Sequence, residues 1–166
     1  MVIPHPSAHD RQRSRGGVLQ TALTWTPLLA ISLGLYIILT WIAGGGHSET
    51  APAIESMLRA SLFGLPMMSG VRWTLTGSDT FLFFSLVLLS FEIVKATSSR
   101  SSAMINHAAS MGVLVLCLIL FLTIANFATS TFFLLTMMVL MDVLVGVIVS
   151  IVSARRDFGV GDGFAN

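Results

Sequence analysis

The chain has 166 residues, of which 54% are hydrophobic and only 10% are charged, and its net charge is +1. Soluble domains carry about 25% charged residues, so this composition excludes an ordinary soluble domain. The high apolar content also excludes a disordered chain, and nine basic residues exclude a nucleic-acid-binding protein that depends on a dense basic face. The class that remains is an all-α integral membrane protein.

The N-terminal segment 1–22 is basic, and we expect it to be a cytoplasmic tail attracted to anionic lipid. His5 and His9 have a spacing that would suit a metal ion on a helix. Pro4 and Pro6 disfavour a helix there, so the sequence predicts no metal site in this tail.

The first predicted span covers residues 23–43, within a stretch that contains no charged residue. A helix needs about 20 apolar residues to cross a bilayer core of ~30 Å. Trp25 and Trp41 lie near its two ends, where tryptophan favours the membrane interface. Pro27 falls in the first turn, where its missing N–H group is tolerated.

A cleaved signal peptide is the alternative for this segment. Ala43, Gly44 and Gly45 are small residues of the kind found at a cleavage site. The apolar stretch before them is about twice as long as a signal-peptide core. We therefore expect an uncleaved anchor, whereas cleavage would leave three spans.

The predicted outer loop, residues 44–79, contains a helix start at Pro52 with Glu55 in its first turn. Glu55 and Arg59 are spaced to pair on one face. Apolar residues recur at helical spacing on another face: Ile54, Met57, Leu58, Leu62 and Leu65. The pattern predicts a short amphipathic helix ending near Pro66, either flat on the outer leaflet or over the bundle. The alternative is a docking surface for a partner protein.

Three more spans are predicted, at residues 80–96, 108–127 and 131–152. The charge-free stretch from 101 to 141 is too long for one helix, and Asn126 and the Thr129-Ser130-Thr131 run interrupt it. Ser130 or Thr129 is expected to cap the helix that follows. The short connection predicts that the last two helices form an antiparallel hairpin.

The basic residues predict the orientation of this four-span domain, residues 23–152. With the N-terminus inside, only Arg59 and Arg72 lie outside. The other seven lie on the cytoplasmic side: Arg11, Arg13, Arg15, Lys95, Arg100, Arg155 and Arg156. We therefore expect a protein of the cell's inner (plasma) membrane with two cytoplasmic ends, the second being the tail 153–166.

Two carboxylates lie inside the predicted spans, where lipid makes a charge expensive. Glu92 lies about three quarters of the way down its helix and has Lys95 three residues on, with Arg100 or His107 also within reach. The simplest interpretation of Glu92 is a satisfied ion pair at a helix end.

Asp142 lies near the middle of the last span without a cation at its depth, which favours the neutral acid. Gly146 and Ser150 continue the same helical face with small residues that permit close helix approach. Candidate hydrogen-bond partners on other helices are Ser32, Tyr36, Ser85, Ser90 and Cys117. The simplest interpretation of Asp142 is an interhelical hydrogen bond.

The functional alternative is a polar line through the membrane that moves protons or ions. Ser32, Tyr36 and Thr40 share one helical face, Thr123 and Asn126 share another, and Ser85 lies on the face of Glu92. The candidate site residues, for function or for helix packing, are Asp142, Glu92, Lys95, Tyr36, Ser32 and Asn126.

The sequence contains no recognised catalytic motif. A single cysteine, Cys117, excludes an intrachain disulfide, a CxxC pair and a thiolate zinc site. P-loop, nucleophile-elbow, HExxH and GxGxxG motifs are all missing. We therefore expect no enzyme, no cofactor and no metal.

Three functions are compatible with these observations. We expect first a non-catalytic accessory, assembly or scaffold subunit of a membrane complex. Its partners would be the lipid bilayer and a membrane protein or a second copy, bound through the helices, and no nucleic acid. The alternative is a proton or ion channel component, or a small transporter, that uses the intramembrane carboxylates. An intramembrane enzyme comes last, because no nucleophile and base pair is recognisable.

Overall fold

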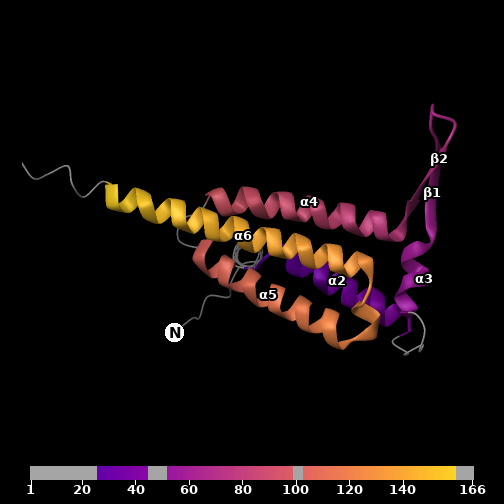
Figure 1. Cartoon of the computed structure of the whole chain (residues 1–166), viewed down its shortest axis with the longest axis horizontal. Helices are drawn as coiled ribbons and strands as arrows, with labels where there is room; N and C mark the ends of the chain where they lie inside the picture. The colour runs from indigo at the N-terminus through magenta and orange to yellow at the C-terminus, as the bar shows by residue number, and fades with distance from the viewer. Residues whose placement is uncertain (1–25, 45–51, 99–102, 160–166) are drawn as a thin grey trace, which may run out of the picture.

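The computed structural model of the chain describes residues 26–44, 52–98 and 103–159. Several expectations fall outside these residues: the basic tail, the metal spacing of His5 and His9, Trp25, and the side chains of Arg100, Arg155 and Arg156. The described part is mostly helical, and Figure 1 shows its helices side by side with a two-stranded arm at one end. We call this end of the bundle the arm end.

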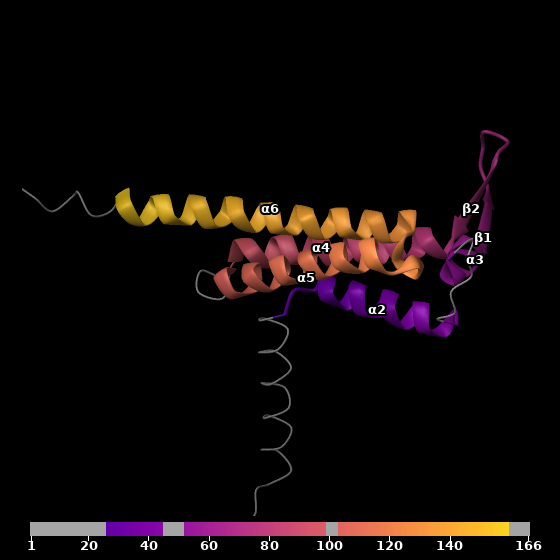
Figure 2. The ribbon, with the colours of Figure 1, turned by 60° about the horizontal axis from the view of Figure 1, so that its bottom comes forward.

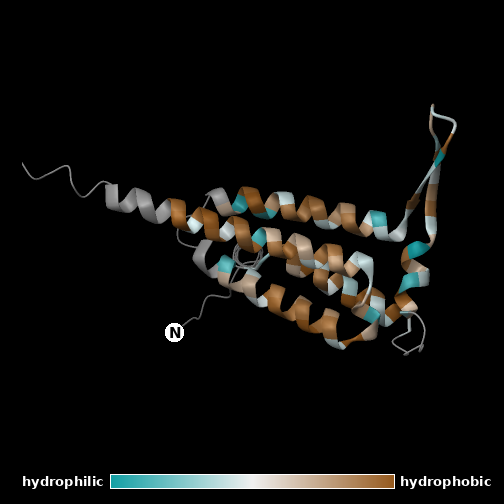
Figure 3. Ribbon diagram, in the orientation of Figure 1, coloured by the Kyte–Doolittle hydropathy of each residue, from teal (hydrophilic) through white to brown (hydrophobic). Residues whose placement is uncertain are grey.

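Three helices are long and apolar enough to cross a membrane: α4 (Gly77–Ser98), α5 (Ala103–Thr123) and α6 (Ser130–Gly159). They correspond to the three later predicted spans. Their length and composition indicate a membrane-embedded protein, as the composition predicts. Ribbons coloured by hydropathy are brown along most of their length (Figure 3).

The remaining apolar helix, α2, is shorter than the first predicted span. It covers Leu29–Ile42, a total of 14 residues, which is about 21 Å at 1.5 Å per residue. Pro27 lies just before it, and its carbonyl accepts a hydrogen bond from Ala30 at 3.0 Å. The four-span arrangement therefore stays a prediction, since three helices meet the length for crossing.

The bundle is built around α6, which packs along both α4 and α5 (Figures 1 and 2). The predicted α5–α6 hairpin is present. However, α5 ends at Thr123, and the short 3-10 helix η1 (Ala125–Phe127) follows instead of more α-helix. Ile124 has extended backbone angles that break the α-helix there. The predicted cap is also present, since Thr129 Oγ1 accepts the N–H of Phe132 at 3.1 Å.

An aromatic cluster fills the core near the arm end. Tyr36 of α2 contacts three phenylalanines, with ring centroids 4.9 to 5.5 Å apart. They are Phe81 of α4, Phe127 of η1 and Phe132 of α6, each at most 5% exposed. Burial of these rings holds four elements together and closes this half of the bundle.

The predicted amphipathic helix of the outer loop is correct only in its first half. Helix α3 covers Ala53–Arg59, with the expected bond from Arg59 Nε to Glu55 Oε1 at 3.0 Å. The chain then forms strand β1 (Ser61–Pro66), which pairs antiparallel with β2 (Arg72–Thr76). Gly64 and Pro66 are poor helix formers, and the turn between the strands uses Gly70 at a φ of 83°.

The two strands form an arm, residues 61–76, that projects across the helix axes in both ribbon views (Figures 1 and 2). Phe63 pairs with Leu75 and Leu65 with Trp73, so these four side chains share one face. Met67 and Val71 continue that face toward the tip. We call this set the apolar face of the arm: Phe63, Leu65, Met67, Val71, Trp73 and Leu75.

Candidate functional site

Two buried carboxyl groups lie in the half of the bundle away from the arm. Glu92 is fully buried and Asp142 is 5% exposed. They come from α4 and α6, and the first turns of α5 supply the groups between them. The two carboxylates nevertheless have different surroundings.

Glu92 belongs to a network that ties α4 to α2 and α5. Its Oε2 accepts the backbone N–H of Leu28 at 2.6 Å, and its Oε1 accepts a hydrogen bond from Asn106 Nδ2. The expected ion pair is also present, with Lys95 Nζ 3.6 Å from Glu92 Oε1. We call Glu92, Lys95 and Asn106, with the backbone of Thr26 and Leu28, the Glu92 network.

This network caps a helix inside the bundle. The first N–H groups of any helix have no partner within it, and Glu92 supplies one for α2 at Leu28. Its negative charge also lies at the positive end of the α2 dipole. Lys95 Nζ completes the arrangement by donating to the Thr26 carbonyl at 3.0 Å and to Asn106 Oδ1 at 3.2 Å. A capping role explains why a charge is buried here.

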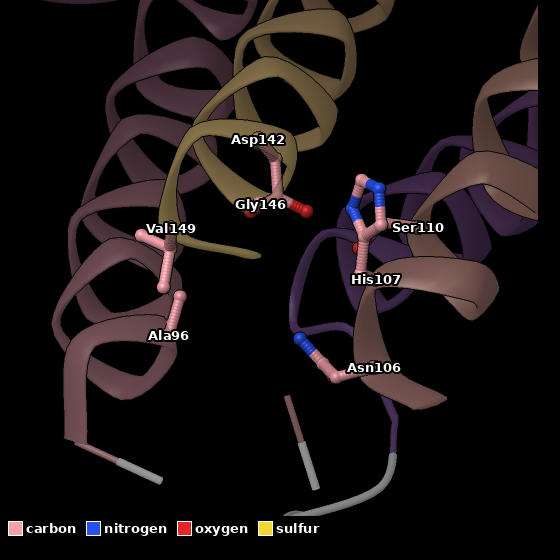
Figure 4. Close-up of a pocket in the computed structure, with 7 residues that line it drawn as sticks. All are labelled: Ala96, Asn106, His107, Ser110, Asp142, Gly146 and Val149. Atoms are coloured by element: carbon pink, nitrogen blue, oxygen red, sulfur yellow. The ribbon is translucent and has the colours of Figure 1, made fainter. Parts of the chain in front are cut away.

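Asp142 lies in a different environment, a small cavity between α4, α5 and α6 (Figure 4). Its volume of about 20 Å³ is enough for one water molecule. The carboxyl group points from α6 toward His107 and Ser110 of α5. We call the lining residues the Asp142 pocket: Ala96, Asn106, His107, Ser110, Asp142, Gly146 and Val149.

Two polar atoms of the Asp142 pocket have no hydrogen-bond partner among the described residues. They are Ser110 Oγ and His107 Nδ1, and Ser110 is only 2% exposed. The Ser110 hydroxyl lies close enough to Asp142 to interact with its carboxyl group, but not in the geometry of a hydrogen bond. Buried polar groups normally find partners, so these atoms stand out.

Gly146 makes room for the imidazole of His107. A Cβ atom at this glycine would lie 2.4 Å from His107 Nδ1, which is well inside van der Waals contact. The small residue four positions after Asp142 therefore permits the close helix approach that the sequence predicts, and its partner is His107.

The remaining predicted site residues lie elsewhere. Tyr36 OH bonds Thr129 Oγ1 at 2.6 Å, and Asn126 Oδ1 accepts the N–H of Ala53 at 3.2 Å, both near the arm end. Ser32 is fully buried, and its Oγ has no partner among the described residues. The structure therefore brings Glu92 and Lys95 together with Asn106, and sets Tyr36 and Asn126 apart from Asp142.

Sequence reasoning missed Asn106 and Ser110, and it placed His107 within reach of Glu92 without connecting it to Asp142. The third span was predicted to begin at residue 108, which left two of these residues before the helix. In the structure α5 begins at Ala103. A polar pattern at positions 106, 107 and 110 has helical spacing, and this signal was present in the sequence.

The chemistry available here is proton binding and hydrogen bonding. No group of three or more His, Cys, Asp or Glu side chains that could hold a metal ion occurs in the described ranges. No protein-family model matches the chain, and neither the curated proteins nor the solved structures include a significant match. The site must therefore be interpreted from its own geometry.

Proposed function

We propose that this chain is a non-catalytic subunit of a membrane complex, and that its arm binds a neighbouring membrane protein. The observation that carries the proposal is the apolar face of the arm. Five of its six side chains are between 40% and 67% exposed, although the arm is paired and ordered by its own backbone hydrogen bonds.

The arm is poorly suited to stand alone. A two-stranded sheet is marginally stable in water without further packing, and nothing else in the described chain covers this one's apolar face. The opposite face carries Gly64, Thr74 and Arg72, and the Arg72 stem passes within 3.5 Å of where a Gly64 side chain would begin. The arm is therefore amphipathic, with one face built for burial.

A protein partner fits this arm better than lipid does. Both outer edges of a two-stranded sheet have unpaired backbone groups, which another strand can satisfy and acyl chains cannot. Because the arm runs across the helix axes (Figure 2), the partner would lie beside the bundle, at the membrane surface.

The proposed location is the inner (plasma) membrane, with the arm on the extracytoplasmic side and both chain ends in the cytoplasm. Arg59 and Arg72 lie toward the arm end, whereas Lys95 lies near the opposite end of α4. With the further basic residues of the sequence, this distribution follows the positive-inside rule.

Site-specific photocrosslinking in native membranes tests the partner. A photoreactive amino acid at Phe63 or Trp73, on the apolar face, should give an adduct with the same single membrane protein. The matched position Thr74, on the opposite face of the same strand, should give much less. With purified components, Leu65→Asp should then weaken binding at least tenfold, and Thr74→Asp should not.

Three results would contradict this function. Adducts with lipid alone would make the arm a membrane-surface element, and adducts with a second copy would indicate self-association instead. Equal crosslinking from both faces would show that the apolar face is not a specific binding surface.

The conduction alternative has weaker support. The Asp142 pocket favours it, but the aromatic cluster of Tyr36, Phe81, Phe127 and Phe132 fills the bundle between that pocket and the arm end. Proton or ion flux into proteoliposomes tests this alternative. Conduction requires that the wild-type protein gives a flux above that of empty vesicles and that Asp142→Asn abolishes this flux.

A further inference from the structure

We propose that Asp142, His107 and Ser110 form a proton-binding site inside the bundle. This inference is independent of the arm and of the partner it binds. It rests on the cavity and on the unpartnered atoms that line it.

The unpartnered atoms indicate a site whose hydrogen bonds are completed by a bound ligand, such as a proton on Asp142 or a water molecule. Ser110 is 98% buried, since only 2% of its surface is exposed, yet its Oγ has no hydrogen-bond partner among the described residues. His107 Nδ1 is also buried and has no hydrogen-bond partner among these residues. Figure 4 shows both side chains on the side of the pocket toward which the Asp142 carboxyl points.

The ligand class follows from the size and donors of the pocket. A volume of about 20 Å³ admits one water molecule and excludes an organic ligand. A hard metal cation prefers six or more oxygen ligands, whereas this pocket offers one carboxylate, one hydroxyl, an imidazole and the Asn106 amide, whose Oδ1 already accepts from Lys95. A proton needs only an acceptor group, together with neighbours that can hydrogen-bond to that group in its protonated and its ionised state.

The surrounding groups provide for both states. When Asp142 is protonated, its O–H can donate to the Ser110 oxygen or to a water molecule in the cavity. When Asp142 is ionised, the Ser110 O–H can donate to it, and the His107 imidazole lies on the same side of the pocket. In both states the unpartnered hydroxyl gains a partner.

Every charged or titratable described group near Asp142 enters its electrostatics. From α4 these are Glu92 and Lys95, and from α5 it is His107. Glu92 and Lys95 already bond each other and α2. His107 differs from these two, because its Nδ1 has no hydrogen-bond partner among the described residues.

Infrared difference spectroscopy of the full chain in nanodiscs tests the site. The carboxylic-acid band of Asp142 is followed from about pH 4 to about pH 9, a range that spans the ordinary titration of carboxyl and imidazole groups. We expect one aspartate band that titrates in the wild-type protein and is missing in Asp142→Asn. Asp79→Asn, which removes an exposed carboxyl group, should leave that band in place.

The neighbours give the second measurement. His107→Gln should change the proton affinity of Asp142 about tenfold, and Ser110→Ala several-fold. The matched hydroxyl control is Ser150→Ala, since Ser150 is exposed and bonds the Gly146 carbonyl of its own helix; it should have no effect. If Asp142→Asn does not fold, isotope-labelled aspartate identifies the band, and the two neighbour variants still decide.

The proposal is overturned if Asp142 keeps one protonation state over the whole range. It is also overturned if the band titrates but neither His107→Gln nor Ser110→Ala moves it. A midpoint that depends on sodium rather than potassium would replace the proton site with a cation site.

Discussion

Glu92 and Asp142 are two carboxylates buried in the same half of one bundle, yet their surroundings differ. Glu92 accepts hydrogen bonds from a backbone N–H and an amide and lies 3.6 Å from an ammonium group. Asp142 faces a hydroxyl and an imidazole with unpartnered atoms, across a cavity with room for one water. Both side chains are buried carboxyl groups, and the number of hydrogen bonds that the chain supplies to each distinguishes them.

The difference teaches that a buried charge is not by itself evidence for function. A carboxylate whose partners are all supplied by the chain stabilises one arrangement of helices. A carboxylate beside polar groups without hydrogen-bond partners can complete its hydrogen bonds, and theirs, with a ligand. The Glu92 network belongs to the first kind, and we assign the Asp142 pocket to the second.

Removal of Glu92 should have the largest effect on stability. Glu92→Ala leaves Lys95 without its ion pair and the Leu28 N–H without an acceptor, and breaking a buried pair in this way costs about 3–5 kcal/mol. The measurement is the free energy of unfolding in mixed micelles, followed by circular dichroism. The matched control is Glu55→Ala, which breaks the exposed pair with Arg59 and should cost less than about 1 kcal/mol.

Equal losses in these two variants would show that the Glu92 network does not stabilise the bundle. The contrast with Asp142 would then rest on the Asp142 pocket alone.

Gly146→Ala should have an intermediate effect. The new Cβ would lie 2.4 Å from His107 Nδ1, so either the imidazole or α6 must shift, at a cost of about 1–3 kcal/mol. The matched control is Gly112→Ala, because no atom lies within 4 Å of that Cβ position. In a helix this control should be neutral or stabilising by up to about 1 kcal/mol. Equal unfolding energies for the two variants would contradict the close contact between α5 and α6.

The smallest effect is expected at the arm end, where a single hydrogen bond joins Tyr36 to Thr129 at 2.6 Å. A double-mutant cycle with Tyr36→Phe and Thr129→Val should give a coupling energy of about 0.6 kcal/mol, typical of hydrogen bonds between membrane helices. Thr129→Val alone should cost more, since Thr129 also caps α6. If the Tyr36–Thr129 coupling energy exceeded the unfolding free energy lost in Glu92→Ala, the arm end and not the Glu92 network would contribute more to stability.

Much of the helical plan could be predicted from composition and charge spacing. The absence of charges from 101 to 141 and the Thr129 cap were enough to place α5, α6 and their hairpin. The Glu55–Arg59 and Glu92–Lys95 pairs followed from local spacing alone. These features depend on residues close together in sequence, which is why the sequence contains them.

The rest depends on contacts between distant segments. The Leu28 N–H at the start of α2 donates to Glu92, 64 residues away, and no local pattern predicts this contact. Strand β1 was predicted as helix because Leu62 and Leu65 fit a helical period, while the alternation of Phe63 and Leu65 also fits a strand. Phe63 and Leu65 form a strand because they pair with Leu75 and Trp73 of β2.

The short length of α2 has a consequence for the surrounding lipid. At about 21 Å its 14 residues fall short of the ~30 Å hydrocarbon core that its neighbours match. Hydrophobic mismatch of this kind is relieved by local thinning of the bilayer, at fractions of a kcal/mol per Å. If α2 crosses the bilayer as the four-span prediction has it, the bundle would present unequal hydrophobic lengths around its circumference, and local thinning would bring headgroups and water toward the start of α2.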